Sequence, residues 1–155
     1  MLRAGYFCAA LVAASTLCQA AQADALTGQE AVAARQHNLK DLGGAFKAVR
    51  DQLRKPQPDL VQVQQAAEQI EQLAADMGRW FPKGSEPGPD VETDAKAEIW
   101  SDTAGFAKVL TRFQQEAPKL LVLAKAADVD GLKKQVGAVG ASCKACHDNY
   151  RVPQD

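Results

Sequence analysis

The chain has 155 residues, a length that favours one domain with a single small hydrophobic core. Its 18 basic and 19 acidic residues leave a formal net charge of −1 at pH 7. Such a balanced charge provides no electrostatic footprint for nucleic acid or for an anionic membrane surface, so we expect neither as a partner.

Residues 1–23 are typical of a cleaved export signal. A basic residue precedes an apolar run at 6–17, and residues 21–23 (Ala-Gln-Ala) match an A-x-A cleavage site. The apolar run is too short for a permanent membrane span. Cys18 allows a lipoprotein alternative, although the leucine before it is a poor match to the small residue that such sites prefer. We therefore predict a cleaved signal peptide and a soluble periplasmic domain at 24–155.

The mature sequence has no useful strand pattern and divides into four helical stretches. The first spans about residues 28–55, with apolar side chains at steps of three and four and Arg35 on the same stripe. Gly43 and Gly44 in its middle predict either a bend or a close approach to the backbone. The Pro-Gln-Pro segment that follows ends this helix.

The next two helices flank the longest irregular stretch of the mature chain. Asp59 is a suitable N-cap for the second helix, which we expect to end near Trp80. The Pro- and Gly-rich residues 81–89 cannot be helical and predict a loop crossing between helices. The third helix is expected from Thr93 or Asp94 to about residue 127, and Pro118 should kink or briefly break it.

The fourth helix carries the remaining apolar stripe. That stripe consists of Leu132, Val136, Val139, Cys143, Cys146 and Tyr150. The two cysteines therefore belong to the face that turns toward the core. Four amphipathic helices with short first and last connections predict an all-α fold, an antiparallel four-helix bundle.

Residues 143–147 read Cys-Lys-Ala-Cys-His, the C-x-x-C-H pattern of covalent haem c attachment. Because helical positions three and four apart share a face, Cys143, Cys146 and His147 can all point at one flat ligand. A thiol–disulfide motif usually opens a helix after a strand, and no strand pattern precedes this one. A tetrahedral zinc site normally needs four protein ligands, and the mature chain offers only one further histidine. We predict one haem c near the C-terminus, with His147 as the axial iron ligand.

The opposite coordination position decides what such a haem can do. Electron carriers usually fill it with Met or His, and the mature chain offers only Met77 and His37. Helical geometry turns His37 toward solvent, and Met77 reads most simply as a packed core residue. We expect Leu39 over the iron, and because leucine cannot ligate it, a vacant and dry distal side.

Three further residues are candidates for the cofactor site. Arg35 on a core stripe needs an anionic partner, for which a haem propionate would serve, or else it snorkels to water from a frayed first turn. Arg151, one turn after His147, suits the proximal side, or simply the negative end of the helix dipole. Phe81 could wall the distal pocket or act as an ordinary core aromatic.

Together these residues resemble the cytochrome c′ family. The match is best over residues 139–151, which read VGASCKACHDNYR, and weaker over 98–102 (EIWSD) and 34–36 (ARQ). The resemblance implies that Cys143 and Cys146 form the thioethers and that His147 is the axial ligand. It also implies that Arg35 is the propionate-side arginine, Arg151 the proximal basic residue and Leu39 the replacement for a sixth-ligand methionine.

The leucine places the chain, by resemblance, in the five-coordinate, high-spin branch that binds nitric oxide and carbon monoxide and often forms homodimers. The expected function is thus that of a periplasmic monohaem cytochrome that binds diatomic gases and transfers electrons to an unknown redox partner. One alternative is a six-coordinate, low-spin electron carrier that uses Met77 or another ligand. Another is a haem-free periplasmic helical interaction protein. The sequence shows no acid–base pair and no nucleophile constellation, so it does not predict an enzyme.

Overall fold

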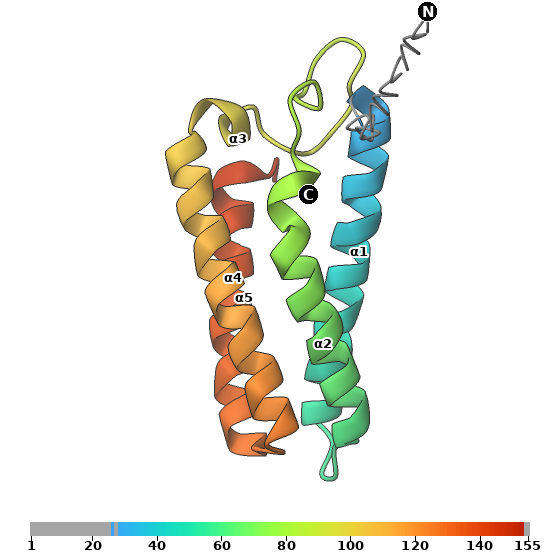
Figure 1. Cartoon of the computed structure of the whole chain (residues 1–155), viewed down its shortest axis with the longest axis vertical. Helices are drawn as coiled ribbons and strands as arrows, with labels where there is room; N and C mark the ends of the chain where they lie inside the picture. Colours follow the sequence, from blue (N-terminus) through green and yellow to red (C-terminus); the bar gives the residue numbers. More distant parts are fainter. Residues whose placement is uncertain (1–25, 27, 154–155) are drawn as a thin grey trace, which may run out of the picture.

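The computed structural model describes residues 26 and 28–153 and confirms the predicted all-α antiparallel four-helix bundle (Figure 1). The elements in chain order are α1 (Gly28–Leu53), α2 (Leu60–Asp76), the 3-10 helix η1 (Met77–Trp80), α3 (Glu98–Ser101), α4 (Thr103–Lys125) and α5 (Val129–Tyr150). The predicted signal peptide and its cleavage site lie outside the described residues. None of the described helices is long and apolar enough to cross a bilayer.

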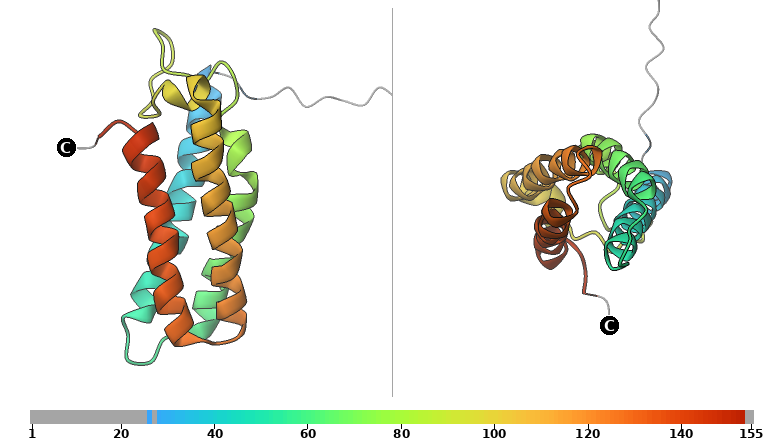
Figure 2. Two further views of the ribbon diagram at one scale, coloured as in Figure 1. Left: turned by 90° about the vertical axis from the view of Figure 1, so that its left-hand side faces the viewer. Right: turned by 90° about the horizontal axis from the view of Figure 1, so that it is seen from below.

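The four long helices form a ring in which three of the four contacts between neighbours are extensive. α1 packs on α2, α2 on α4 and α4 on α5, whereas α1 and α5 make far fewer contacts with each other. Short turns join α1 to α2 and α4 to α5 at one end of the bundle, and residues 81–97 cross over at the other end (Figures 1 and 2). The least closed side of the bundle therefore lies between α1 and α5.

The apolar stripes predicted from the sequence turn inward and form the core. Its largest fully buried aliphatic side chains are Val32, Val49, Val63, Ile70, Leu120, Leu132 and Val139. Burying each contributes about 1.5–3 kcal/mol. The predicted N-cap of α2 is confirmed, because the Asp59 carboxylate accepts hydrogen bonds from the amides of Val61 and Gln62 at 3.0 and 3.1 Å.

The predicted start of the third helix is wrong. Residues 93–97 are not helical, and the chain makes only the single turn of α3 before Asp102 breaks it with φ −103° and ψ 61°. The Asp102 carboxylate then accepts a hydrogen bond from the Gly105 amide at 3.0 Å and begins α4 as its N-cap. Residue 95 instead pairs with Arg151 in an isolated antiparallel bridge.

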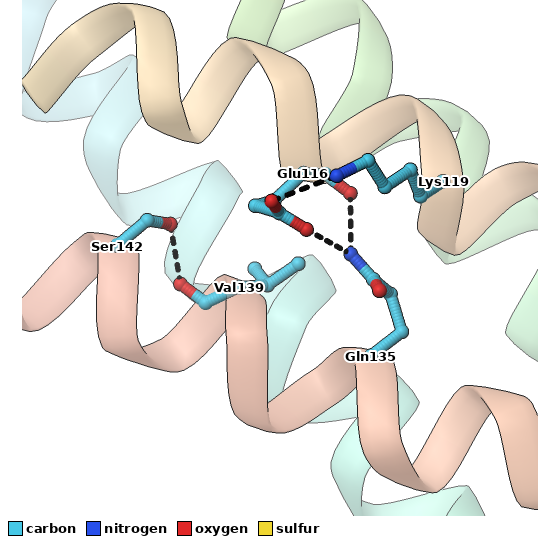
Figure 3. Close-up of polar contacts among 5 residues, drawn as sticks. All are labelled: Glu116, Lys119, Gln135, Val139 and Ser142. Atoms are coloured by element: carbon cyan, nitrogen blue, oxygen red, sulfur yellow. Dashed lines mark hydrogen bonds and ion pairs between the residues drawn. The ribbon is translucent and has the colours of Figure 1, made fainter. Parts of the chain in front are cut away.

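Of the kink or break expected at Pro118, the break does not occur, and α4 is continuous across this residue. Nearby residues fix this part of α4 to its neighbours. The side chain of Gln114 donates to the carbonyl of Ala74 in α2 at 2.9 Å. Gln135 of α5 donates to the backbone carbonyl and to the carboxylate of Glu116, at 3.0 and 2.7 Å (Figure 3).

The pair Gly43–Gly44 does not interrupt α1. No atom lies within 4 Å of where a Cβ on either glycine would be, so no other part of the described chain approaches the backbone there. Gly43 instead lines the main cavity of the bundle.

Candidate haem site

A cavity of about 470 Å³ opens among α1, α4, α5 and the residues that precede α3. Its volume lies within the range of small-molecule and cofactor sites, and its walls are mainly apolar. Every site residue predicted from the sequence lines it. These residues are Arg35, Leu39, Phe81, Cys143, Cys146, His147 and Arg151.

The C-x-x-C-H motif occupies the last two turns of α5 and faces this cavity. Cys143 and Cys146 are half-buried and free, so they form no disulfide with each other. Burial raises the pKa of Cys143, and burial together with the neighbouring thiol raises the pKa of Cys146 to about 11. Both thiols are therefore neutral near pH 7. The motif ends a helix and does not open one after a strand, unlike a typical thiol–disulfide motif.

His147 lies on the edge of the same cavity with its side chain accessible to solvent. Partial burial lowers its pKa, the charge of Arg151 lowers it further, and Asp148 acts in the opposite direction. The imidazole is therefore neutral near pH 7, which is the form that coordinates iron. The described residues contain no group of three or more His, Cys, Asp or Glu side chains that could hold a metal ion.

Across the cavity, α1 supplies an apolar wall. Leu39 is 38% exposed although it belongs to the apolar stripe of α1, and it lines the cavity with Leu42 and Phe46. His37 points to solvent, where it lies 3.3 Å from Asp41 in an i, i+4 pair. It is not among the residues that line the cavity.

Met77, the other candidate for a sixth ligand, is buried in the core and also touches the cavity. The packed-core interpretation of Met77 therefore describes its surroundings correctly, while its contact with the cavity keeps the ligand interpretation open.

Arg35 is 2% exposed, so the interpretation of a frayed, snorkelling arginine is wrong. Its guanidinium donates to the Ser85 hydroxyl at 3.0 Å, to the Thr93 hydroxyl at 3.0 Å and to the carbonyls of Trp80 and Ser85 at 3.3 Å. It also lies 5.0 Å from the centre of the Phe81 ring. Burial lowers its pKa, yet an arginine keeps its charge.

No carboxylate of the described residues forms an ion pair with Arg35. Its positive charge borders the cavity with neutral partners only. A ligand with an acidic group would complement it.

Sequence reasoning missed the partners that hold these residues in place. Ser85 is fully buried in a loop whose composition predicts only exposure, and Thr93 was expected at the start of a helix. Tyr150 was expected on the core stripe, but its hydrogen bond to Asp102 at 2.9 Å was not. The position of Arg35 on a core stripe predicted an anionic partner, whereas the partners within the described chain are neutral hydroxyl and carbonyl groups.

An antiparallel four-helix bundle that directs a C-x-x-C-H motif into an apolar cavity defines the class of helical c-type cytochromes. The model of one family, described as Cytochrome C', matches residues 30–151. The chain therefore belongs to the cytochrome c′ family.

Known relatives and solved structures agree with this assignment. Cytochrome c′ of Alcaligenes xylosoxydans xylosoxydans is 38% identical over 124 residues, which cover 79% of this chain and 94% of the relative. A cytochrome c′ with ligand-controlled dimer dissociation superposes with a TM-score of 0.76 at 28% identity, over 83% of this chain and 98% of that one. A ferrous variant of cytochrome c′ from Alcaligenes xylosoxidans, with bound NO, gives a TM-score of 0.72 at 36% identity, over 81% and 95%.

Proposed function

We propose that this protein holds one haem c through thioethers to Cys143 and Cys146, with His147 as the axial ligand, and binds nitric oxide or carbon monoxide at the opposite face. The motif residues lie on one face of α5 and line a cavity of suitable size. When bound, the haem supplies an iron centre that can take a diatomic ligand. The chemistry is ligand binding, with electron transfer as an additional role, and not substrate turnover.

The observation that carries the proposal is the position of Leu39. It projects into the cavity from α1, whereas the motif lines the cavity from α5. A leucine has no atom that can coordinate iron, and its neighbours in the cavity wall, Leu42 and Phe46, offer no iron ligand either. A haem iron with His147 as its only protein ligand would be five-coordinate and high-spin, with its sixth position free for a small uncharged gas.

The charged and aromatic residues around the cavity have supporting roles. The buried cation of Arg35 suits a haem propionate, because it has no carboxylate partner in the described chain. Arg151 lies beside His147 and would cover the proximal side. Phe81 packs against Phe106 at 5.0 Å between ring centres and would form part of the distal wall.

The relatives support the same activity and assembly. Solved forms of the Alcaligenes xylosoxidans protein carry bound NO in one case and carbon monoxide in another. A further member of the family has a dimer that dissociates under ligand control. We accordingly propose a homodimer. From the pattern of residues 1–23 we further propose export to the periplasm, with the signal peptide removed after Ala23.

A six-coordinate electron carrier is the second candidate, and the contact of Met77 with the cavity favours it. Absorption spectra of the purified holoprotein, ferric and ferrous, with and without carbon monoxide, separate the two functions. We expect high-spin spectra in both oxidation states and a shift of the ferrous bands with carbon monoxide. Low-spin spectra that carbon monoxide leaves unchanged would refute gas binding, and the absence of haem bands would refute both functions.

A further inference from the structure

The proposed iron ligand lies where a helix is ordinarily least stable. His147 belongs to the last turn of α5, which ends at Tyr150. The final carbonyls of a helix lack partners within it, and terminal turns open more readily than the interior. A ligand on such a turn needs support from outside the helix if its position relative to the cavity is to be fixed.

The structure provides that support from residues 94–102. The backbone amide of Lys96 donates to the carbonyl of Tyr150 at 3.0 Å, and the amide of Val152 donates to the carbonyl of Asp94 at 2.8 Å. These two bonds flank the isolated bridge between residues 95 and 151. These backbone hydrogen bonds attach the end of α5 to residues 94–96, which precede α3.

A side-chain hydrogen bond also joins the end of α5 to the start of α4. The Tyr150 hydroxyl donates to Oδ2 of Asp102 at 2.9 Å, while Oδ1 of Asp102 accepts from the Gly105 amide at 3.0 Å. One carboxylate thus starts α4 and holds the end of α5. Tyr150 is 6% exposed, and its ring packs against Phe106 with 5.3 Å between ring centres.

The fit around this pair leaves no room for a methyl group unless one of the two side chains moves. A Cβ on Gly105 would lie 2.1 Å from Oδ2 of Asp102 and 2.5 Å from the Tyr150 hydroxyl oxygen. Glycine at residue 105 therefore leaves the space that the hydrogen bond between Asp102 and Tyr150 occupies.

We infer that the Asp102–Tyr150 pair is a positioning device for the proximal ligand: it fixes the last turn of α5 against α4 and so sets where His147 stands relative to the cofactor. This inference rests on the proposed role of His147 as the iron ligand. Tyr150 also lines the cavity, but the role inferred for the pair is not ligation of the iron. The pair acts through the backbone of the turn that carries His147.

The test compares two variants of the holoprotein that each lose a side-chain bond between α4 and α5. Tyr150→Phe keeps the aromatic ring and removes only the hydroxyl. Gln135→Met removes the donor that binds Glu116 (Figure 3). It lies twelve residues before His147, about 18 Å along the helix at 1.5 Å per residue.

Two readouts are measured, neither of which depends on gas-binding activity. In Tyr150→Phe we expect the backbone amides of residues 151 and 152 to exchange with deuterium on the order of tenfold faster. We also expect the iron–imidazole stretch of the ferrous protein, measured by resonance Raman spectroscopy, to shift or broaden. Gln135→Met should leave both as in the unmodified protein.

If the amides of residues 151 and 152 exchange at an unchanged rate in Tyr150→Phe, the pair does not hold the end of α5 in place. Faster exchange with an unchanged iron–imidazole band would overturn the positioning role, and so would an equal change of that band in Gln135→Met. The unmodified protein gives the separate control on the proposed function. If it shows no iron–imidazole band, His147 is not the ligand, and both that function and the positioning role are refuted.

Discussion

Gly105→Ala is the substitution whose cost can be worked most directly from the structure. The new methyl group would lie 2.1 Å from Asp102 Oδ2 and 2.5 Å from the Tyr150 hydroxyl oxygen. Both obstructing atoms are ends of side chains and can move. Moving them, however, breaks the cap of α4 and the hydrogen bond between Asp102 and Tyr150.

The two losses exceed the gain from the better helix former. Losing an N-cap costs about 1 kcal/mol, and losing a hydrogen bond to a charged group costs about 1.5–3 kcal/mol. Replacing glycine by alanine inside a helix returns about 1 kcal/mol. We therefore expect Gly105→Ala to lower the free energy of unfolding by about 1.5–3 kcal/mol.

Urea unfolding of the holoprotein, followed by circular dichroism, measures this difference. Gly44→Ala in α1 and Gly137→Ala in α5 are matched controls, because nothing lies within 4 Å of the added methyl group in either. Both should raise the free energy of unfolding by up to about 1 kcal/mol. If Gly105→Ala is as stable as these controls, the junction between α4 and α5 has more room than its geometry indicates.

Leu39→Met should supply a sixth ligand and move the iron toward low spin, and an unchanged absorption spectrum would show that residue 39 is not above the iron. Arg35→Ala should lower the free energy of unfolding by about 2–4 kcal/mol, since it orphans buried hydroxyl and carbonyl groups, and limited proteolysis should then cut within residues 81–97. Lys119 and then Gln135 lower the pKa of Glu116, so this carboxylate stabilises the fold above its ordinary pKa and loses that contribution as the pH falls through its lower folded value. The difference in unfolding free energy between Glu116→Gln and the unmodified protein should therefore shrink as the pH falls below about 4.5, and a difference that is constant with pH would contradict the ion pair.

The bundle was predictable because its signals are local. Apolar side chains at steps of three and four indicate each helix, and Asp59 followed by an apolar run indicates a helix start. The C-x-x-C-H motif is equally local, since five consecutive residues contain its whole pattern. The helical period alone predicts that the motif lies on the core-facing side of α5.

The junctions of the site depend instead on residues far apart in the sequence. The break at Asp102 depends on two contacts of its carboxylate. The contact with the Gly105 amide is local, whereas the contact with Tyr150 spans 48 residues and leaves no local signal. In the same way, Arg35 finds its hydroxyl partners 50 and 58 residues away, at Ser85 and Thr93. Periodicity in one helix cannot reveal contacts that only the assembled bundle creates.

The sparse contact between α1 and α5 has a consequence for how such a protein can change over evolutionary time. The attachment motif belongs to α5 and the opposite wall, with Leu39, belongs to α1. Because these two helices barely pack on one another, a substitution on one requires little repacking of the other. With the function proposed above, attachment of the haem and selection of its gas ligand would therefore be separable traits, and the side chain at residue 39 could vary while the motif on α5 stays the same.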